Sequence, residues 1–595
     1  MHGACAPIRD YAVIGDGRTV ALVRRDATID WLCLPNLDSG SVFAALLDSE
    51  RGGGFALTPS VPFGVERRYV PGTNVLETTF RTDDGAVRVT DAMTLPDARL
   101  GPFRELARRV EGLAGRVPMH WRIEPRFHYA QGSVRIQARR PFPVALSHGD
   151  ALAMCAWDAG GSRCDTGAVT GEFEAREGSR ALLALASAHG EPLVVPARAE
   201  VEARLDATVT YWQRWSGELT YAGAWRDAVV RSALALKLLV FAPSGAIAAA
   251  PTTSLPEAIG GDRNWDYRFS WLRDSSFTLE ALLQLGRHTE ATAFFWWFMH
   301  ATRLTHPRLH PFYRLDGGAY APETTVPLAG YRDSRPVRVG NDAAAQLQLD
   351  TFGNLLDTAY AYADRGFRID RDTAGELADL ADFVCTAWRE PDRGIWEVRM
   401  ASRHFTHSKA MCWIALDRAV RLAERGVLPP QRSARWKQEA ARVRAFIDER
   451  CWSPSKQTYV RFAGSEELDA SLLLLPILRY ADVRDPRMIR TTDAVRRELG
   501  RGPLVYRYLG DDGLRGGEGV FLCCSFWLVE ALALTGRRED AAALMDALLA
   551  LGNDVGLYAE EMNPETHEFL GNFPQGLVHL ALISAAAAFD HERAA

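Results

Sequence analysis

The chain contains very little lysine: only four of its 69 basic residues are lysine, so 65 are arginine. Such a bias is typical of a GC-rich genome rather than of a binding surface. The chain also has no excess of positive charge, because its formal net charge is −6 and its pI is about 6.2. A domain that binds nucleic acid normally carries a clear excess of positive charge. The sequence therefore predicts no nucleic-acid partner.

Long apolar runs and paired cysteines are also lacking. No apolar run reaches the ~18 residues that a membrane-spanning helix needs, and the first residues, MHGACAPIRDYAVIGDG, lack the basic and apolar segments of a secretory signal. The nine cysteines are odd in number, form no CxxC pair and have apolar neighbours, which predicts buried thiols rather than disulfides or zinc ligands. We therefore predict a cytoplasmic protein with no membrane partner, no metal and no other cofactor.

The length of 595 residues is too great for one ordinary core and predicts at least two domains. Up to about residue 195, short segments rich in β-branched and aromatic residues, such as TVALV, TIDWLCL and VRVTDAM, alternate with turn signals. This spacing predicts an antiparallel β-sandwich over residues 1–195. The next stretch, RAEVEARLDATVTYWQRWS, predicts a linker helix within 196–223.

From residue 224 to 595 the apolar period is helical and predicts twelve helices. Their expected ranges are 225–242, 273–285, 288–303, 342–364, 372–389, 405–424, 431–450, 467–479, 486–498, 517–535, 537–551 and 575–589. Short and long connections alternate along this series. All long connections then fall at one end, which is the pattern of an (α/α)6 toroid whose rim is built from loops.

The long connections hold most of the chemically suggestive side chains. One of them, GIWEVRMASRHFTHSK, contains a single acid, Glu397, between Trp396 and Val398. A carboxyl beside apolar side chains has the setting of a general acid, whereas a surface ion pair with Arg399 is the plainer alternative. Other long connections carry Trp, Tyr, Arg and carboxylate side chains. Long loops in compact domains are usually functional.

Carboxylates, planar rings and Arg/Asp pairs without a phosphate-binding loop suit a neutral sugar. Aromatic faces pack on the C–H faces of pyranose rings, and Asp and Arg satisfy the hydroxyl groups. Two carboxyl groups on opposite sides of a glycosidic bond can protonate the leaving oxygen and activate water.

Four of these motifs, GGDRNWDYRFSWLRDS, GNDAAAQLQLD, GIWEVRMASRHFTHSKAMCW and EEMNPETHEFLGNFPQ, together resemble the glucoamylase family of glycoside hydrolases, family 15. The chain is more similar to the bacterial glucoamylase/trehalase-like branch, whose trehalase-like N-terminal domain resembles IRDYAVIGDGRTVALVRRDATIDWLCLPNLDS. The resemblance covers nearly the whole chain. It implies a β-sandwich, a linker helix and an (α/α)6 barrel, and exo-hydrolysis of α-glucosides with inversion.

The resemblance also implies roles for single residues. Glu397 matches the general acid and Glu560 the general base, while the adjacent Glu561 stands where fungal members often have Gln. A set of side chains is expected to bind the terminal glucose or lie near the bond that is cut: Tyr267, Trp271, Arg273, Asp274, Trp396 and Arg507.

Five further residues have weaker signals. His404 and His407 have metal-ligand spacing, but no third ligand is evident, so hydrogen bonding within the rim is the preferred interpretation. Asp511 and Asp512 are expected in a solvated turn. Glu518 is expected at the start of a helix, where a structural role is as well supported as a substrate contact.

The predicted function is an exo-acting, inverting α-glucoside hydrolase that releases β-glucose from α-gluco-oligosaccharides. A glucoamylase-like activity on maltose or isomalto-oligosaccharides is placed ahead of α,α-trehalose hydrolysis, although trehalases share the same motifs. An inverting phosphorylase and a non-catalytic glucan-binding protein are the remaining alternatives. The expected partner is an α-glucosyl oligosaccharide or disaccharide, and a homo-oligomer is a possible assembly.

Overall fold

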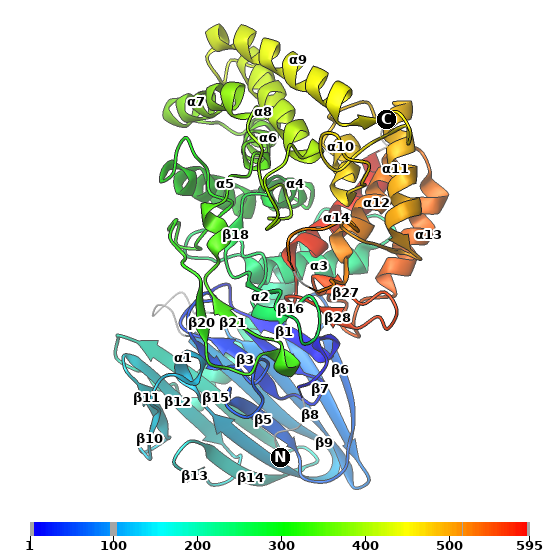
Figure 1. Ribbon diagram of the computed structural model, residues 1–595. Coiled ribbons are helices and arrows are strands. Elements are labelled where there is room, and N and C mark those ends of the chain that lie inside the picture. The colour runs from blue at the N-terminus through cyan, green and yellow to red at the C-terminus, as the bar shows by residue number, and fades with distance from the viewer. Residues whose placement is uncertain (1–4, 96–103, 515, 592–595) are drawn as a thin grey trace.

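The computed structural model describes residues 5–95, 104–514 and 516–591. The strands of the N-terminal third gather at one end of the molecule, and the helices of the remaining chain form the other end (Figure 1). This order of elements agrees with the predicted change in the spacing of apolar residues, from the alternation of strands to the period of helices, near residue 200.

The N-terminal strands form one antiparallel network, in which every pairing is antiparallel. They are β1 Tyr11–Gly15, β2 Val20–Arg24, β3 Ile29–Cys33, β4 Ser41–Phe43, β5 Gly54–Pro59, β6 Gly64–Tyr69, β7 Leu76–Thr82, β8 Gly85–Met93, β9 Arg104–Glu124, β10 Arg135–Gln137, β11 Val144–Ser147, β12 Asp150–Trp157, β13 Arg163–Cys164, β14 Val169–Arg176 and β15 Arg180–His189.

The long strand β9 joins two parts of this network. Its first half pairs with β8 and β15, as in Val110 opposite Val89 and Ala181. Its second half pairs with β5 and β14, as in Ile123 opposite Phe55 and Val169. One strand of 21 residues thus belongs to both halves of the network and ties them together. A short turn, α1 (Phe127–Ala130), follows it.

Helix α2 (Arg198–Gly217) connects the strands to the helices, as the sequence predicted. On one side, Arg204 Nε and Nη2 donate to the buried carboxylate of Glu105 on β9 at 3.0 and 2.6 Å. Near its other end, Trp215 Nε1 donates to Glu290 at 2.7 Å. The helix therefore contacts both parts of the molecule.

Twelve further helices follow in the described chain. They are α3 Arg226–Leu239, α4 Ser275–Gln284, α5 His288–Arg303, α6 Asp350–Asp364, α7 Arg371–Ala387, α8 Thr406–Glu424, α9 Ser433–Arg450, α10 Leu474–Ile477, α11 Pro486–Leu499, α12 Leu522–Leu534, α13 Arg538–Leu549 and α14 Gly576–His591. The even-numbered helices α4 to α14 each contact the next, and α14 contacts α4, which closes a ring. The odd-numbered helices pack against that ring from outside (Figure 1).

Three predicted helices differ from the observed ones. The range 342–364 begins helical only at Asp350, because Asn341 caps a separate 3-10 turn by accepting a hydrogen bond from the N–H of Ala343. The range 517–535 begins at Leu522, because residues 520–521 pair as a strand. The range 467–479 is a 3-10 turn followed by the short α10.

Short strands order the connections between the helices. They are β16 Thr253–Pro256, β17 Asn264–Asp266, β18 Ser270–Trp271, β19 Phe312–Tyr313, β20 Thr324–Val326, β21 Val337–Val339, β22 Trp452–Ser453, β23 Thr458–Tyr459, β24 Gly500–Arg501, β25 Leu504–Val505, β26 Val520–Phe521, β27 Glu561–Met562 and β28 Phe569–Leu570. The loops of the rim are therefore held by backbone pairing rather than by side chains alone.

The strand domain contacts the rim connection that precedes α4. Trp31 Nε1 on β3 donates to the carbonyl of Pro251 at 3.0 Å. Arg268 is buried, donates to the carbonyl of Ser39 at 2.8 Å and forms a bidentate ion pair with Asp266. Because Asp266 and Arg268 flank Tyr267, these contacts help to fix the position of that predicted site residue.

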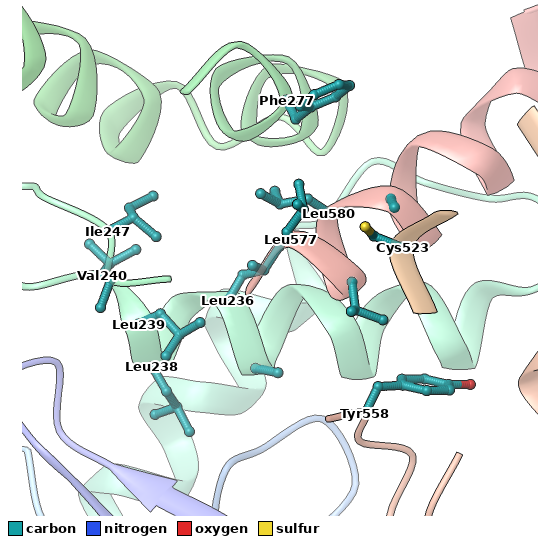
Figure 2. Close-up of a cluster of buried hydrophobic side chains, with 14 of the residues drawn as sticks. Leu236, Leu238, Leu239, Val240, Ile247, Phe277, Cys523, Tyr558, Leu577 and Leu580 are labelled. Carbon is teal, nitrogen blue, oxygen red and sulfur yellow. The ribbon is translucent and has the colours of Figure 1, made fainter. Parts of the chain in front are cut away.

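Apolar side chains of α3, α12 and α14 pack together beneath the rim (Figure 2). Leu236 and Leu239 of α3 meet Leu577 and Leu580 of α14 in this cluster. Burying a Leu side chain contributes about 1.5–3 kcal/mol relative to leaving it exposed. The cluster includes Tyr558, so it also anchors the connection that carries Glu560.

All nine cysteines are free thiols, and seven of them are buried, as predicted; Cys5 is partly buried and Cys164 is exposed. Among the described residues, none of the helices combines the length and the apolar character that a bilayer-spanning segment requires.

Candidate active site

A pocket lies where the connections before α4, α8 and α12 meet. Five of the eight predicted site residues line it, namely Tyr267, Arg273, Trp396, Glu397 and Arg507. Because α4, α8, α12 and α14 belong to the inner ring, residues that precede them converge on one rim. The free volume of this pocket is about 30 Å³.

Glu397 occupies the loop before α8 in a left-handed backbone conformation, with φ = 57°. This conformation is strained for a residue with a side chain, and such strain clusters at functional sites. Its Oε1 accepts a 2.6 Å hydrogen bond from Nε1 of Trp271 and lies 4.0 Å from Nη1 of Arg273. With 18% of its side chain exposed, the carboxyl is accessible from the pocket that it lines.

The indole that contacts Glu397 is therefore that of Trp271 rather than that of its sequence neighbour Trp396. Trp396 Nε1 donates instead to both oxygens of the buried Asp469, at 2.9 and 3.1 Å. The Trp396 ring also lies 5.5 Å from the guanidinium carbon of Arg507. Trp396 is thus fixed at its N–H edge, and its ring forms part of the pocket wall.

Arg273 and Asp274 form a buried pair directly before α4. Arg273 Nε donates to Asp274 Oδ1 at 2.7 Å, and Arg273 Nη1 donates to the carbonyl of Ile395 at 3.3 Å. Burial alone would lower the pKa of Arg273, but the carboxylates of Asp274 and Glu397 raise it. Arg273 therefore remains charged and joins the connection before α4 to the one that carries Glu397.

Glu560 lies in the connection before α14 and is almost completely buried. Its Oε2 accepts a 3.1 Å hydrogen bond from the N–H of Asn572, whereas Oε1 has no hydrogen-bond partner among the described residues. Burial raises the pKa of Glu560, and the Asn572 N–H and Arg507 oppose this shift. Burial also raises the pKa of Tyr267, and the charges of Glu560 and Glu397 add to the effect. The pKa of Tyr267 thus depends on the charges of both predicted catalytic carboxylates.

Glu561 is the first residue of β27, and its environment differs from that of Glu560. Its Oε2 accepts a hydrogen bond from the N–H of Gly519 at 2.8 Å, and its Oε1 lies 3.5 Å from Nη2 of Arg507. Successive side chains of an extended segment point to opposite sides. Glu561 is therefore directed to Arg507, although Oε1 of each glutamate lacks a hydrogen-bond partner among the described residues.

Arg507 is held by more carboxylates than the sequence suggested. Its Nε donates to Glu518 at 3.1 Å, and its Nη2 donates to Glu257 at 3.3 Å. The carboxylates of Glu257, Glu518 and Glu561 lie within 4.8 Å of one another. Burial raises the pKa of Glu257 to about 8, although Arg507 opposes the shift. The arginine supplies the positive charge that such a cluster needs.

Glu257 was not predicted as a site residue, and no motif marked it, because its partner Arg507 lies 250 positions away. Glu518 does not begin a helix, since α12 starts at Leu522, and it binds Arg507 and Arg263 instead. The predicted solvated turn at Asp511 and Asp512 is wrong for Asp512, whereas Asp511 is exposed. Asp512 is buried and accepts hydrogen bonds from Arg263 Nη1 at 2.7 Å and from the Tyr508 hydroxyl at 2.9 Å.

Asp512 also contacts the backbone of the loop that follows Glu397. Its carbonyl oxygen accepts hydrogen bonds from the N–H groups of Arg399 and Met400 at 2.9 and 2.8 Å. The loop after Glu397 is therefore tied to the loop after Arg507.

His404 and His407 do not form the hydrogen bonds predicted for them. Among the described residues, neither ring nitrogen of His407 has a partner, and Nδ1 of His404 has none. Burial lowers the pKa of His407 to about 3, and Arg273 adds to the effect, so this side chain is neutral. The His404 ring packs 5.5 Å from that of Phe446.

Comparison with known families decides the classification. The profile described as Glycosyl hydrolases family 15 matches residues 223–587, and the one described as Trehalase-like, N-terminal matches residues 1–147. The chain belongs to glycosyl hydrolase family 15. It is therefore a glycoside hydrolase of the glucoamylase or trehalase kind, in agreement with the resemblance seen in its motifs.

Two relatives in family 15 match almost the whole chain. A trehalase from Thermoplasma volcanium (strain ATCC 51530 / DSM 4299 / JCM 9571 / NBRC 15438 / GSS1) is 35% identical over 586 residues, covering 97% of this chain and 93% of the relative. A trehalase from Mycolicibacterium smegmatis (strain ATCC 700084 / mc(2)155) is 38% identical over 620 residues, covering 97% and 90%.

A solved structure of a bacterial glucoamylase in complex with acarbose shares the fold. Its TM-score is 0.73 at 13% sequence identity, and the match covers 99% of this chain and 94% of the other. At this identity the likeness concerns the fold alone. It supports the helical toroid and its N-terminal antiparallel sheet.

The Arg273–Asp274 pair leads to a prediction about substrate binding. Asp274→Ala should lower kcat/KM by about tenfold or more, because a charge-assisted hydrogen bond is lost and Arg273 is left buried without that partner. Steady-state kinetics on a disaccharide would measure the change. Asp372→Asn, at an exposed position of α7, is the matched control. Unchanged kinetics in Asp274→Ala would assign the pair a purely structural role.

Proposed function

We propose that this family 15 enzyme is an α,α-trehalase. The observation that carries the proposal is the name trehalase of two relatives that match 97% of the chain at 35 and 38% identity. These relatives favour trehalose as the substrate over maltose and isomalto-oligosaccharides, which were the first prediction from the sequence motifs. A glucoamylase-type glucosidase becomes the second candidate, favoured by the fold shared with a bacterial glucoamylase.

In the proposed mechanism, Glu397 protonates the oxygen that links the two glucose units, and Glu560 removes a proton from the attacking water. Arg273 and Asp274 hold hydroxyls of the glucose that is attacked, and Tyr267, Trp271 and Trp396 shape its site. Arg507 lies near the bond that breaks. A general base acting through water inverts the anomeric centre, so no phosphate is needed as the nucleophile.

The division of the chain belongs to the same proposal. We assign residues 1–195 to a β-sandwich, 196–223 to a linker with its helix, and 224–595 to an (α/α)6 catalytic toroid. Exo-action, a cytoplasmic location and a possible homo-oligomer remain predictions.

A substrate panel tests the proposed function. Glucose release from trehalose, maltose, isomaltose and soluble starch should give the highest kcat/KM for trehalose, by at least about tenfold. A pocket that hydrogen-bonds the hydroxyls of one partner sugar rejects a differently linked one by leaving polar groups unpaired. Equal or faster hydrolysis of maltose would favour the glucoamylase-type candidate instead. Glucose 1-phosphate formed only when phosphate is added would indicate a phosphorylase.

A further inference from the structure

A second cavity lies at the end of the helical ring opposite to the rim. The catalytic candidates precede the first residues of α4, α8 and α14, whereas this cavity is lined by later parts of the inner helices. Its walls include Phe277 and Glu280 of α4, Tyr360 of α6, and Glu530 of α12. The cavity volume is about 460 Å³, within the range of small-molecule sites.

This cavity, which we call the back cavity, is separate from the active-site pocket. The two share no lining residue. Phe277, which lines the back cavity, lies 6.2 Å from the ring of Trp527, and Trp527 lies 6.0 Å from the ring of Trp396 in the active-site wall. The rings of Phe277, Trp527 and Trp396 thus connect the wall of the back cavity to the wall of the active-site pocket.

The buried end of the back cavity carries a carboxyl without a partner. Glu530 is 9% exposed, and among the described residues its Oε2 has no hydrogen-bond partner. No basic side chain of the described chain forms an ion pair with it, and Glu280 is its charged neighbour. Burial and Glu280 raise the pKa of Glu530 to about 8. A buried carboxyl is costly unless a cation or a hydrogen-bond donor meets it.

The exposed part of the back-cavity lining carries two arginines beside the carboxylates of Glu280 and Asp364. Arg365 and Arg479 line the cavity and are exposed. In the described residues neither guanidinium forms an ion pair, although both lower the pKa of Glu280. The third basic residue, Arg418, is already engaged with Asp357 and Asp417 at 2.6 Å each.

The wall of the back cavity also includes the apolar side chains of Leu478 and Leu534 and the ring of Tyr360. We propose that the back cavity binds a small zwitterion, with an ammonium group at Glu530, a carboxylate at Arg365 and Arg479, and a short aliphatic chain between them. Each part of such a molecule meets its chemical complement. This site is independent of the glycosidic reaction.

The test uses 6-aminohexanoate and its isostere 6-hydroxyhexanoate, titrated calorimetrically into the full-length protein. We expect saturable binding of one 6-aminohexanoate per chain and about tenfold or more weaker binding of 6-hydroxyhexanoate, because only the ammonium group brings a positive charge to the carboxylate of Glu530. Glu530→Gln should weaken binding of the amine to a similar extent. Glu539→Gln, at an exposed position in the first turn of α13, should bind as the wild type does.

Two further measurements separate the back cavity from the active site. Binding of 6-aminohexanoate should persist in Glu397→Gln and in the presence of excess glucose. Ala361→Phe, at a half-buried position of the cavity wall, should abolish it by filling the space, which keeps the test valid if Glu530→Gln does not fold. No saturable binding to the wild type, equal affinity for the hydroxyl compound, or displacement by glucose would each overturn the proposal.

Discussion

Glu397→Gln should lower the turnover of a natural disaccharide by about 10²–10⁴-fold, the usual contribution of a positioned acid–base group. The amide keeps the shape of the side chain and can still accept the hydrogen bond from Trp271. It cannot protonate the oxygen of the leaving glucose. The measurement is kcat of the purified variant on trehalose and on maltose.

The leaving group supplies an internal control for this variant. An aryl α-glucoside with an acidic phenol needs little protonation, so its hydrolysis should suffer much less than that of a disaccharide. Equal losses on both substrates would indicate that Glu397 does not act as the acid. Wild-type turnover of the disaccharide by a folded variant would exclude any catalytic role for Glu397.

Helices and their order could be predicted because the relevant signals are local. The apolar period places α5 at His288–Arg303 and α8 within one residue of its predicted range. The failures occur where a long-range pairing overrides local propensity. Residues 520–521 leave the helical pattern because Val520 and Phe521 pair with Met562 and Glu561, about 40 positions further along the chain.

The sequence also predicted which side chains are candidates for the active site. It did not predict which of these side chains contact one another. Glu397 was singled out by its neighbours Trp396 and Val398, yet its hydrogen-bond partner is Trp271, which lies 126 positions away. Likewise, Arg507 was expected near the substrate, but its partner Glu257 follows a stretch without chemical signal. Partners of this kind depend on the closure of the helical ring, which brings distant connections to one rim.

The anomeric form of the products tests inversion. Inverting hydrolysis of trehalose should initially give equal amounts of α- and β-glucose, because the attacked unit inverts and the departing unit keeps its configuration. A retaining enzyme gives α-glucose from both units. Early proton NMR spectra distinguish the two outcomes, and β-glucose alone should appear first from an aryl α-glucoside. Inversion also requires carboxyl groups roughly 6.5–9.5 Å apart rather than the ~5–5.5 Å of retaining enzymes.

The identity of the base is tested by Glu560→Gln and Glu561→Gln. Glu560→Gln should lower kcat by about 10²–10⁴-fold, because the amide cannot take a proton from the attacking water as the carboxylate of the proposed base does. Glu561→Gln should lower kcat less than Glu560→Gln does. Its carboxylate binds the Gly519 N–H and lies beside Arg507, and Arg507 keeps Glu257 and Glu518 as partners. The reverse order of effects would move the base to Glu561 without changing the inverting mechanism.

The pH profile provides a second test of this assignment. A general base must be ionised, and burial raises the pKa of Glu560 above its ordinary value of 4.5. Activity should therefore fall as the pH decreases through this raised pKa, so the acid limb of kcat/KM should lie above 4.5. In Glu561→Gln the acid limb should remain above 4.5, because burial still acts on the carboxyl group of Glu560. A limb at or below 4.5 would contradict the role of the buried Glu560 as the base.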